Sequence, residues 1–340
     1  MKPWALDYLA CPETGSPLVL RDAVCEEGEI LSGTLVNSAG RAYIVRRGVP
    51  QLGLAHQSGA EARTVAAFGE QWGAFETCRG FMASRELFFS FFPTLTADEF
   101  RGKTALEAGC GNGRWLPRMA QFGARHVIGL DYSESVSQSW HQTRVLPNVT
   151  VVQGSILRPP LARNAFDLVV SMGVIHHLDD PLLGMTRLGE LLVPSYGKIA
   201  VWVYAREGNE LYLALVAPLR KLCPRLPAPL LLLLSRGLAV PVWLHAHTLG
   251  RWLGIRRDGS FRLPMAGYFD LLRRLSFRDV VNIVHDQLTP QLARYYRRHE
   301  VEALFAGAGL TLVACETPRG NSYSAAGVRR RADSSIPNVA

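Results

Sequence analysis

Residues 104–115, TALEAGCGNGRW, decide the fold. A short apolar run ends in three glycines at alternate positions, Gly109, Gly111 and Gly113, and a segment of helical character follows. Glycine permits close approach of the backbone to a ligand, and the free N–H groups at a helix start attract polar groups. The sequence therefore predicts a strand, a loop and a helix that together hold a nucleotide-like ligand. A tight turn that binds nothing is the plain alternative.

The same rhythm of strand, loop and helix repeats along the chain. Strands are expected at TALEAG, HVIGLD, VTVVQG, FDLVVSMG and GKIAVWVY, with helical segments between most of them. Near the end, LTLVACE and SYSAAGVR are joined by TPRGN, which is too short for a parallel crossover, so these two strands are expected to be antiparallel. This alternation predicts an α/β fold with a doubly wound sheet.

The chain divides into five expected parts. Residues 1–55 contain short apolar runs separated by turn residues and predict a small β-rich module, and residues 56–100 predict a helical segment that closes over the cofactor. Residues 101–205 and 291–331 form the α/β core. Between them, 206–290 predict a helical lid that contacts the substrate, and 332–340 a loose tail.

Composition limits the classes of protein to consider. Hydrophobic residues make up 48% of the 340 residues and the formal charge is +8, but the basic residues are scattered, which argues against specific nucleic-acid binding. The start lacks the pattern of a signal peptide, and six distant cysteines are typical of reduced thiols, so we expect a cytoplasmic protein. The apolar stretch 226–246 holds three prolines and Arg236, which favours a buried or lid helix over a membrane span, or a surface that meets lipid.

Two carboxylates indicate which nucleotide-like ligand the loop holds. Glu107 lies at the mouth of the loop, where it would repel a pyrophosphate and attract a cation. Asp131 ends the second strand, where a carboxylate can accept hydrogen bonds from both hydroxyls of a ribose. An adenosine with a positively charged amino-acid arm fits both, and that molecule is S-adenosylmethionine. A nicotinamide or flavin dinucleotide is the competing ligand.

Four motifs resemble those of class I S-adenosylmethionine-dependent methyltransferases of the type 11 group. They are LEAGCGNG, GLDYS, FDLVVSMGVIHHLDDP and LLVPSYGKIAVWV, and the resemblance covers about 101–206 and 296–330. It implies a seven-stranded sheet of order 3-2-1-4-5-7-6 with strand 7 antiparallel. It also implies that S-adenosylhomocysteine is the product.

The resemblance assigns cofactor contacts to residues along the strand ends. Glu107, Gly109, Cys110 and Gly111 would line the methionine arm, Asp131 would hold the ribose, and Tyr132, Ser155 and Ile156 would surround the adenine. The fourth strand would contribute Ser171 and Met172, and Gln71 would reach the cofactor from the preceding helix.

The N-terminal stretch resembles a second family. LDYLACPETGSPL and GRAYIVRRGVPQL are similar to the zinc-ribbon-like domain of the tRNA methyltransferase activator family. Tetrahedral zinc needs about four ligands, and Cys11 and Cys25 cannot supply them. We therefore expect a metal-free module that rests on its β core and Tyr43.

Candidate bases lie near the carboxyl ends of the strands and in the insertion. They are His176 and His177 after the fourth strand, and His285 with Asp286 in IVHDQLTP. His177 can instead shape the turn, and Asp286 can cap the following helix. A base is needed only when the acceptor holds its proton near neutral pH.

The expected function is transfer of a methyl group to a small, hydrophobic or lipid-like acceptor in a biosynthetic pathway. Two other functions stay open. One is a non-methylating reaction of S-adenosylmethionine, such as a cyclisation that releases methylthioadenosine. The other is a cofactor-binding scaffold that assists a partner without turnover.

Overall fold

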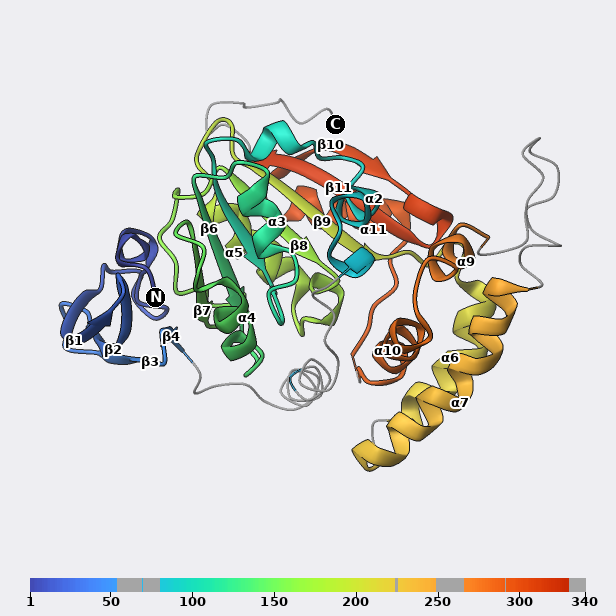
Figure 1. Cartoon of the computed structure of the whole chain (residues 1–340). Coiled ribbons are helices and arrows are strands. Elements are labelled where there is room, and N and C mark those ends of the chain that lie inside the picture. Colours follow the sequence, from blue (N-terminus) through green and yellow to red (C-terminus); the bar gives the residue numbers. More distant parts are fainter. Residues whose placement is uncertain (54–68, 70–79, 224–225, 249–265, 291, 330–340) are drawn as a thin grey trace, which may run out of the picture.

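The computed structural model describes residues 1–53, 69, 80–223, 226–248, 266–290 and 292–329 (Figure 1). Its strands form one continuous sheet in the order β1-β2-β3-β4-β7-β6-β5-β8-β9-β11-β10. The fold is mixed α/β with a mostly parallel central part, as the sequence predicts.

The central strands coincide with the expected apolar runs. They are β5 (Thr104–Ala108), β6 (His126–Asp131), β7 (Val149–Gln153), β8 (Leu168–Met172) and β9 (Lys198–Tyr204), and they pair in parallel. β5 and β7 are buried along their whole length, because helices cover both faces of the sheet. β10 (Leu310–Glu316) and β11 (Ser322–Arg329) complete the sheet, and β11 runs antiparallel to both β9 and β10.

The core helices connect these strands. They are α3 (Leu116–Gln121), α4 (Val136–Thr143), α5 (Pro181–Leu191) and α11 (Arg298–Gly307). Asp180 caps α5, since its side chain accepts from the Leu183 N–H, and Pro181 occupies the first turn, where its missing N–H is not needed. Because β5 to β9 pair in parallel, their carboxyl ends all lie at the same edge of the sheet.

The N-terminal strands extend the central sheet. The short helix η1 (Pro3–Tyr8) precedes β1 (Val19–Glu26), β2 (Glu29–Val36), β3 (Ala42–Arg46) and β4 (Val49–Gln51). These four strands form an antiparallel meander, and β4 then pairs in parallel with β7 at Gln51↔Gln153. The sequence predicts the β-rich module, but not its junction with the core sheet.

The region before the first core strand is described from residue 80. It contains η2 (Gly80–Ala83), α2 (Arg85–Phe91) and η3 (Ala97–Phe100), which pack Leu87, Phe88 and Phe92 into the core. Within 54–79 the structure describes Gly69, where an added Cβ would lie 3.7 Å from Ser133 Cβ at the end of β6. The expected cofactor contact Gln71 lies outside the described residues.

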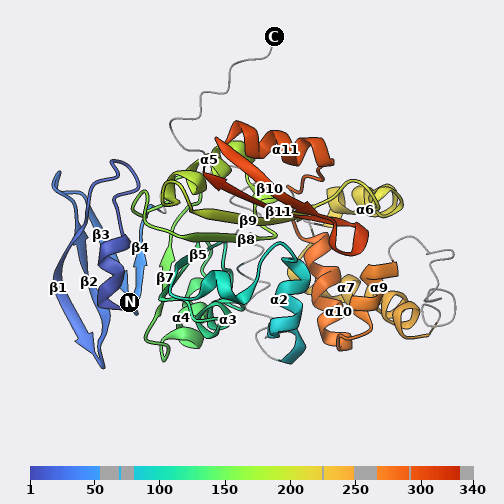
Figure 2. The ribbon, with the colours of Figure 1, turned by 90° about the horizontal axis from the view of Figure 1, so that it is seen from above.

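The insertion after β9 is helical. It contains α6 (Glu210–Leu222), α7 (Ala228–His247), α9 (Ala266–Leu272) and α10 (Phe277–Leu288), which lie at the opposite end of the sheet from β1–β3 (Figures 1 and 2). Ser276 and Asp279 form a capping box that starts α10, since each side chain bonds the backbone N–H of the other residue.

Candidate cofactor and acceptor site

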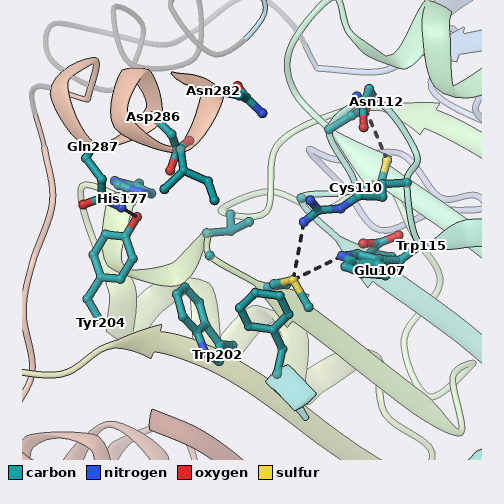
Figure 3. A pocket seen from close by; sticks show the side chains of 18 of the residues that line it. Glu107, Cys110, Asn112, Trp115, His177, Trp202, Tyr204, Asn282, Asp286 and Gln287 are labelled. Atoms are coloured by element: carbon teal, nitrogen blue, oxygen red, sulfur yellow. Dashed lines mark hydrogen bonds between the residues drawn. The ribbon is translucent and has the colours of Figure 1, made fainter. Parts of the chain in front are cut away.

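A single cavity of about 300 Å³ joins the glycine-rich loop to the helical insertion. On one side it is lined by the ends of β5, β6 and β8, and on the other by α2, β9, α9 and α10. In Figure 3, Asn282 and Asp286 project from α10 on one side, with Glu107, Cys110 and Trp115 across from them. Ligand sites of doubly wound folds lie at this edge of the sheet.

The glycine loop is fixed mainly by contacts within the protein. Gly109 and Gly113 have φ of 81° and 80°, which L-residues with side chains rarely adopt. A Cβ on Gly109 would lie 2.3 Å from Val174 Cγ2, and one on Gly113 would lie 2.9 Å from Ser139 Cβ. Packing within the protein therefore requires glycine at both positions. Gly109 and Gly111 line the cavity, whereas Gly113 is not part of its lining.

Glu107 is a buried carboxylate at the base of the cavity. Glu107 is only 3% exposed, and its Oε2 has no hydrogen-bond partner among the described residues. Burial raises the pKa of Glu107 to about 8, with Arg114 opposing and Asp131 adding to the shift. An unpartnered buried acceptor of this kind is costly unless a donor arrives. The ammonium group of a methionine arm would supply one, so the residues present fit the cofactor.

Asp131 connects the loop to the strand end. Its Oδ2 accepts from the Gly111 N–H at 2.7 Å, and its Oδ1 accepts from the N–H and the hydroxyl of Ser133 at 2.8 and 2.6 Å. Burial raises the pKa of Asp131, and these hydrogen bonds oppose the rise. Each carboxylate oxygen has two lone pairs, so one on Oδ2 remains beyond these three bonds and can accept from a ribose hydroxyl.

The other expected cofactor residues divide into two groups. Cys110, Tyr132, Ser155, Ile156 and Met172 line the cavity, and Met172 Sδ accepts from Trp115 Nε1 at 3.1 Å. Ser171 is not part of the lining. It is fully buried and donates to the Ala108 carbonyl at 2.9 Å, so it ties β8 to β5. The expectation that Ser171 contacts the cofactor is therefore wrong in this structure, because alternate residues of a strand face opposite sides.

The two histidines after β8 have different surroundings. His177 lines the cavity, and its Nδ1–H donates to the Leu292 carbonyl at 2.5 Å, which leaves the neutral ring with an acceptor at Nε2. Burial lowers the pKa of His177 to about 4. His176 is fully buried beneath Tyr204, with ring centroids 4.0 Å apart, and both its nitrogens lack partners among the described residues. His176 is thus not placed to act as the base.

His285 and Asp286 do not form the oriented pair that the sequence allows. His285 faces α7, where its Nδ1 lies 3.0 Å from Ser235 Oγ, while Asp286 lines the cavity. Residues i and i+1 of a helix are about 100° apart, which explains the separation. Asp286 also lies inside α10 (Phe277–Leu288), so it does not cap a following helix. The role of base proposed for His285 is therefore wrong in this structure.

Several lining residues were not identified from the sequence. Trp202 lies two residues before Tyr204 on β9, and Asn282 lies one helical turn before the candidate Asp286 on α10. These spacings place each pair on one face of its element and could have indicated a shared site. Tyr212, Tyr268, Tyr295, Arg319 and Gln287 come from separate segments, and no spacing in the sequence joins them.

A hydrogen-bond network fixes the side of the cavity formed by the insertion. Gln287 Nε2 donates to the Tyr204 hydroxyl at 3.0 Å, and the Tyr212 hydroxyl donates to Gln287 Oε1 at 2.6 Å. Arg220 Nε also donates to the Gln287 carbonyl at 2.6 Å. These bonds join α6, β9 and α10, so the helices of the insertion are held to the core sheet around the cavity.

The state of Glu107 predicts how cofactor binding depends on pH. Below a pKa of about 8 the free carboxyl is mostly protonated, so uptake of an ammonium group must release a proton. Affinity should therefore rise up to about tenfold per pH unit toward pH 8, and fall above it as the ligand's amine loses its proton. Calorimetry in two buffers with different ionisation enthalpies counts the released proton, and an affinity that is flat with pH would contradict the prediction.

The same shift predicts the opposite trend for the stability of the ligand-free protein. A carboxyl whose pKa is higher in the folded than in the unfolded state holds its proton more tightly when folded. The contribution of Glu107 to stability is thus complete below its unfolded pKa of about 4.5 and is lost as pH rises through about 8. Cofactor should consequently protect the fold most at the alkaline end of this window.

Comparison with known proteins agrees with this geometry. A family model described as "Methyltransferase domain" matches residues 106–195. The chain is 34% identical over 113 residues to a tRNA U34 carboxymethyltransferase of Cronobacter sakazakii, and 37% identical over 114 residues to one of Haemophilus influenzae. Each alignment covers 32% of this chain, and it spans only 34% and 35% of those two relatives.

A solved structure is also similar. Magnesium protoporphyrin IX methyltransferase from Synechocystis PCC 6803, with bound S-adenosylhomocysteine, is 13% identical, with a TM-score of 0.46 over 79% of this chain and 98% of that one. The described residues contain no group of three or more His, Cys, Asp or Glu that could hold a metal ion. The match over residues 106–195 supports a methyltransferase domain in this part of the chain, and the site at its strand ends fits S-adenosylmethionine as its cofactor.

Proposed function

We propose that the enzyme transfers a methyl group from S-adenosylmethionine to a small, largely apolar acceptor bound among β9, α9 and α10. The observation that carries this proposal is the continuity of the cavity, which runs from Glu107 and Asp131 to the wall formed by the insertion. The cofactor supplies an electrophilic methyl group. The protein's task is to align an acceptor with it and to exclude water.

The lining beyond the glycine loop indicates the class of acceptor. Met82, Leu87, Phe91, Trp202, Tyr268, Leu271, Leu275 and Ile283 give it apolar and aromatic walls. Asn282 and Asp286 are polar side chains on the same face of α10, one turn apart. An apolar body with a polar group near the reacting atom matches such a lining. A polynucleotide would need an open, basic groove instead.

The acceptor class is tested by labelling. The full chain is incubated with S-adenosylmethionine carrying an isotopically labelled methyl group, in one reaction with an organic extract of the expression host and in a second with its total tRNA. The products are identified by mass spectrometry. We expect label in an apolar small molecule together with S-adenosylhomocysteine. Label in tRNA would overturn the small-molecule proposal in favour of the acceptor in the relatives' name. Methylthioadenosine as the nucleoside product would indicate non-methylating chemistry, and no turnover would indicate a scaffold.

We assign the role of base to His177 and the placing of the acceptor's polar group to Asp286. His177 keeps its proton on Nδ1 through the Leu292 carbonyl, so Nε2 can accept a proton from the acceptor. His177→Gln should lower kcat about 100-fold with the identified acceptor. Asp286→Asn should mainly raise KM.

The pH profile separates these roles from a structural effect. With saturating cofactor, kcat of the wild type should be level above the His177 pKa of about 4 and should fall below it, as the ring becomes protonated. This fall at acid pH should be absent in His177→Gln. His285→Gln is the matched control, because His285 faces Ser235 on α7 instead of lining the cavity. A loss of kcat in His285→Gln as large as in His177→Gln, in a variant that still binds cofactor, would contradict the assignment.

A further inference from the structure

The outer face of α7 is apolar along the length of the helix. Leu230, Leu233, Val240 and Leu244 are 48%, 63%, 45% and 47% exposed, and they recur at spacings of three, seven and four residues. These spacings place them on one side of the helix, and Arg236 is the charged residue exposed among them. We call Leu230, Leu233, Arg236, Val240 and Leu244 the outer face of α7. An exposed apolar surface of this kind marks a contact site.

The inner face of α7 packs against the rest of the protein. Leu231, Ser235, Ala239 and Ala246 are buried, and Ser235 Oγ lies 3.0 Å from His285 Nδ1 on α10. Pro229–His247 is long and apolar enough to cross a membrane, but 22% of it is buried in the protein. To cross a bilayer, α7 would have to leave α10 or take α10 with it. α10 carries Asp286, so a position parallel to a surface fits the packing better.

The charge pattern of this region matches an anionic surface. From residue 211 to 250 the sequence contains four basic residues and no Asp or Glu, within a chain of formal charge +8. Arg220 bonds Gln287 beside the cavity, so Arg236 is the basic residue of this stretch that the described residues show exposed on the outer face. Exposed Phe277 packs edge-on against Trp243 near the end of α7, with ring centroids 6.2 Å apart. An exposed arginine among exposed leucines, with aromatic residues at one end, is typical of helices that lie in a lipid interface.

We propose that the outer face of α7 docks on the surface of a membrane that contains anionic lipids, with the helix lying in the plane of the interface. α7 lies at the outer edge of the molecule, beyond α10 (Figure 1). α9 and α10 lie between α7 and the cavity, so docking brings this wall of the cavity next to the lipid. The proposal goes beyond the methyl-transfer reaction and holds for any acceptor.

Vesicle flotation with the full chain tests the docking. The vesicles contain phosphatidylcholine alone, or phosphatidylcholine with roughly one-third phosphatidylglycerol. Wild-type protein should float with the anionic vesicles, and higher salt should weaken its binding. Leu233→Asp combined with Leu244→Asp should lower the partition coefficient at least about tenfold. Arg236→Gln should lower binding to anionic vesicles about fivefold and leave binding to phosphatidylcholine unchanged.

The matched control carries the same change of charge on other surfaces. Val145 and Val313 are 78% and 54% exposed and lie away from α7, so Val145→Asp combined with Val313→Asp should float like the wild type. Cofactor binding and thermal melting check that each variant is folded. Equal losses in the two double variants would overturn the proposal, as would wild-type protein that binds neither vesicle. A wild-type dimer that dissociates on Leu233→Asp combined with Leu244→Asp, without vesicle binding, would assign the outer face to a second copy.

Discussion

Glu107→Gln should weaken the binding of S-adenosylmethionine about 100-fold, because the ammonium group of the ligand loses its expected carboxylate partner at the base of the cavity. Glu107 Oε2 is buried and unpartnered among the described residues, and burial raises the pKa of Glu107 to about 8. The carboxyl is thus largely neutral in the ligand-free protein near pH 7. Glutamine has the same shape and no charge, so the variant should fold as well as the wild type. Isothermal titration calorimetry measures the loss.

Three ligands make this experiment specific. S-adenosylhomocysteine has the same amino-acid arm and should lose the same factor, whereas methylthioadenosine lacks the arm and should bind both proteins equally. Asp131→Asn should instead weaken all three, because its expected contact is with the ribose that they share. Glu302→Gln on α11, a residue whose side chain is half exposed in an ion pair with Arg298, is the control for a surface change. Equal binding of S-adenosylmethionine by Glu107→Gln and wild type would contradict the proposed contact.

Gly109→Ala should be among the most destabilising substitutions in the core, with a loss of about 3 kcal/mol or more in the free energy of unfolding. Two costs add at this position. The backbone has φ of 81°, which alanine adopts at a cost of about 1–2 kcal/mol, and the new Cβ would lie 2.3 Å from Val174 Cγ2. Urea unfolding monitored by circular dichroism measures the loss.

A second glycine separates the two costs. Gly309 follows the C-cap of α11 with φ of 71° and has open space around an added Cβ, so Gly309→Ala should lose only about 1 kcal/mol. Val174→Ala should restore part of the stability of Gly109→Ala, because it removes the methyl groups that the new Cβ meets. Equal losses at the two glycines would show that the contact with Val174 contributes nothing.

The central sheet could be predicted from the sequence because its strands are buried on both faces. β5, β7 and β8 are short, largely apolar runs between turn residues, so they can be recognised without knowing their long-range contacts. The positions of Glu107 and Asp131 could also be predicted, because both residues lie at the carboxyl ends of these recognisable strands. The junction of β4 with β7 could not be predicted, since one parallel pair at Gln51↔Gln153 leaves no pattern in either strand.

The acceptor side of the site was harder to predict because it is assembled from separate segments. His285 and Asp286 are adjacent in sequence, but the helix turns one toward Ser235 and the other into the cavity. Ser171 and Met172 divide in the same way on β8, with Met172 in the cavity lining and Ser171 bonded to Ala108. In both cases the residue type was a reasonable choice, and the direction of the side chain decided its role.

The junction between β4 and β7 links the N-terminal strands to the strand ends that line the cavity. Gln51 Nε2 donates to Gln153 Oε1 at 3.0 Å, and the Leu52 N–H donates to the Gln153 carbonyl at 2.9 Å. Gln153 Nε2 in turn reaches the Tyr132 carbonyl at 3.2 Å, directly beside Asp131. Gln51 and Gln153 thus connect β4 to the end of β6, where Tyr132 lines the cavity. A protein that binds β1–β3 would therefore contact an element that is hydrogen-bonded directly to the cavity wall.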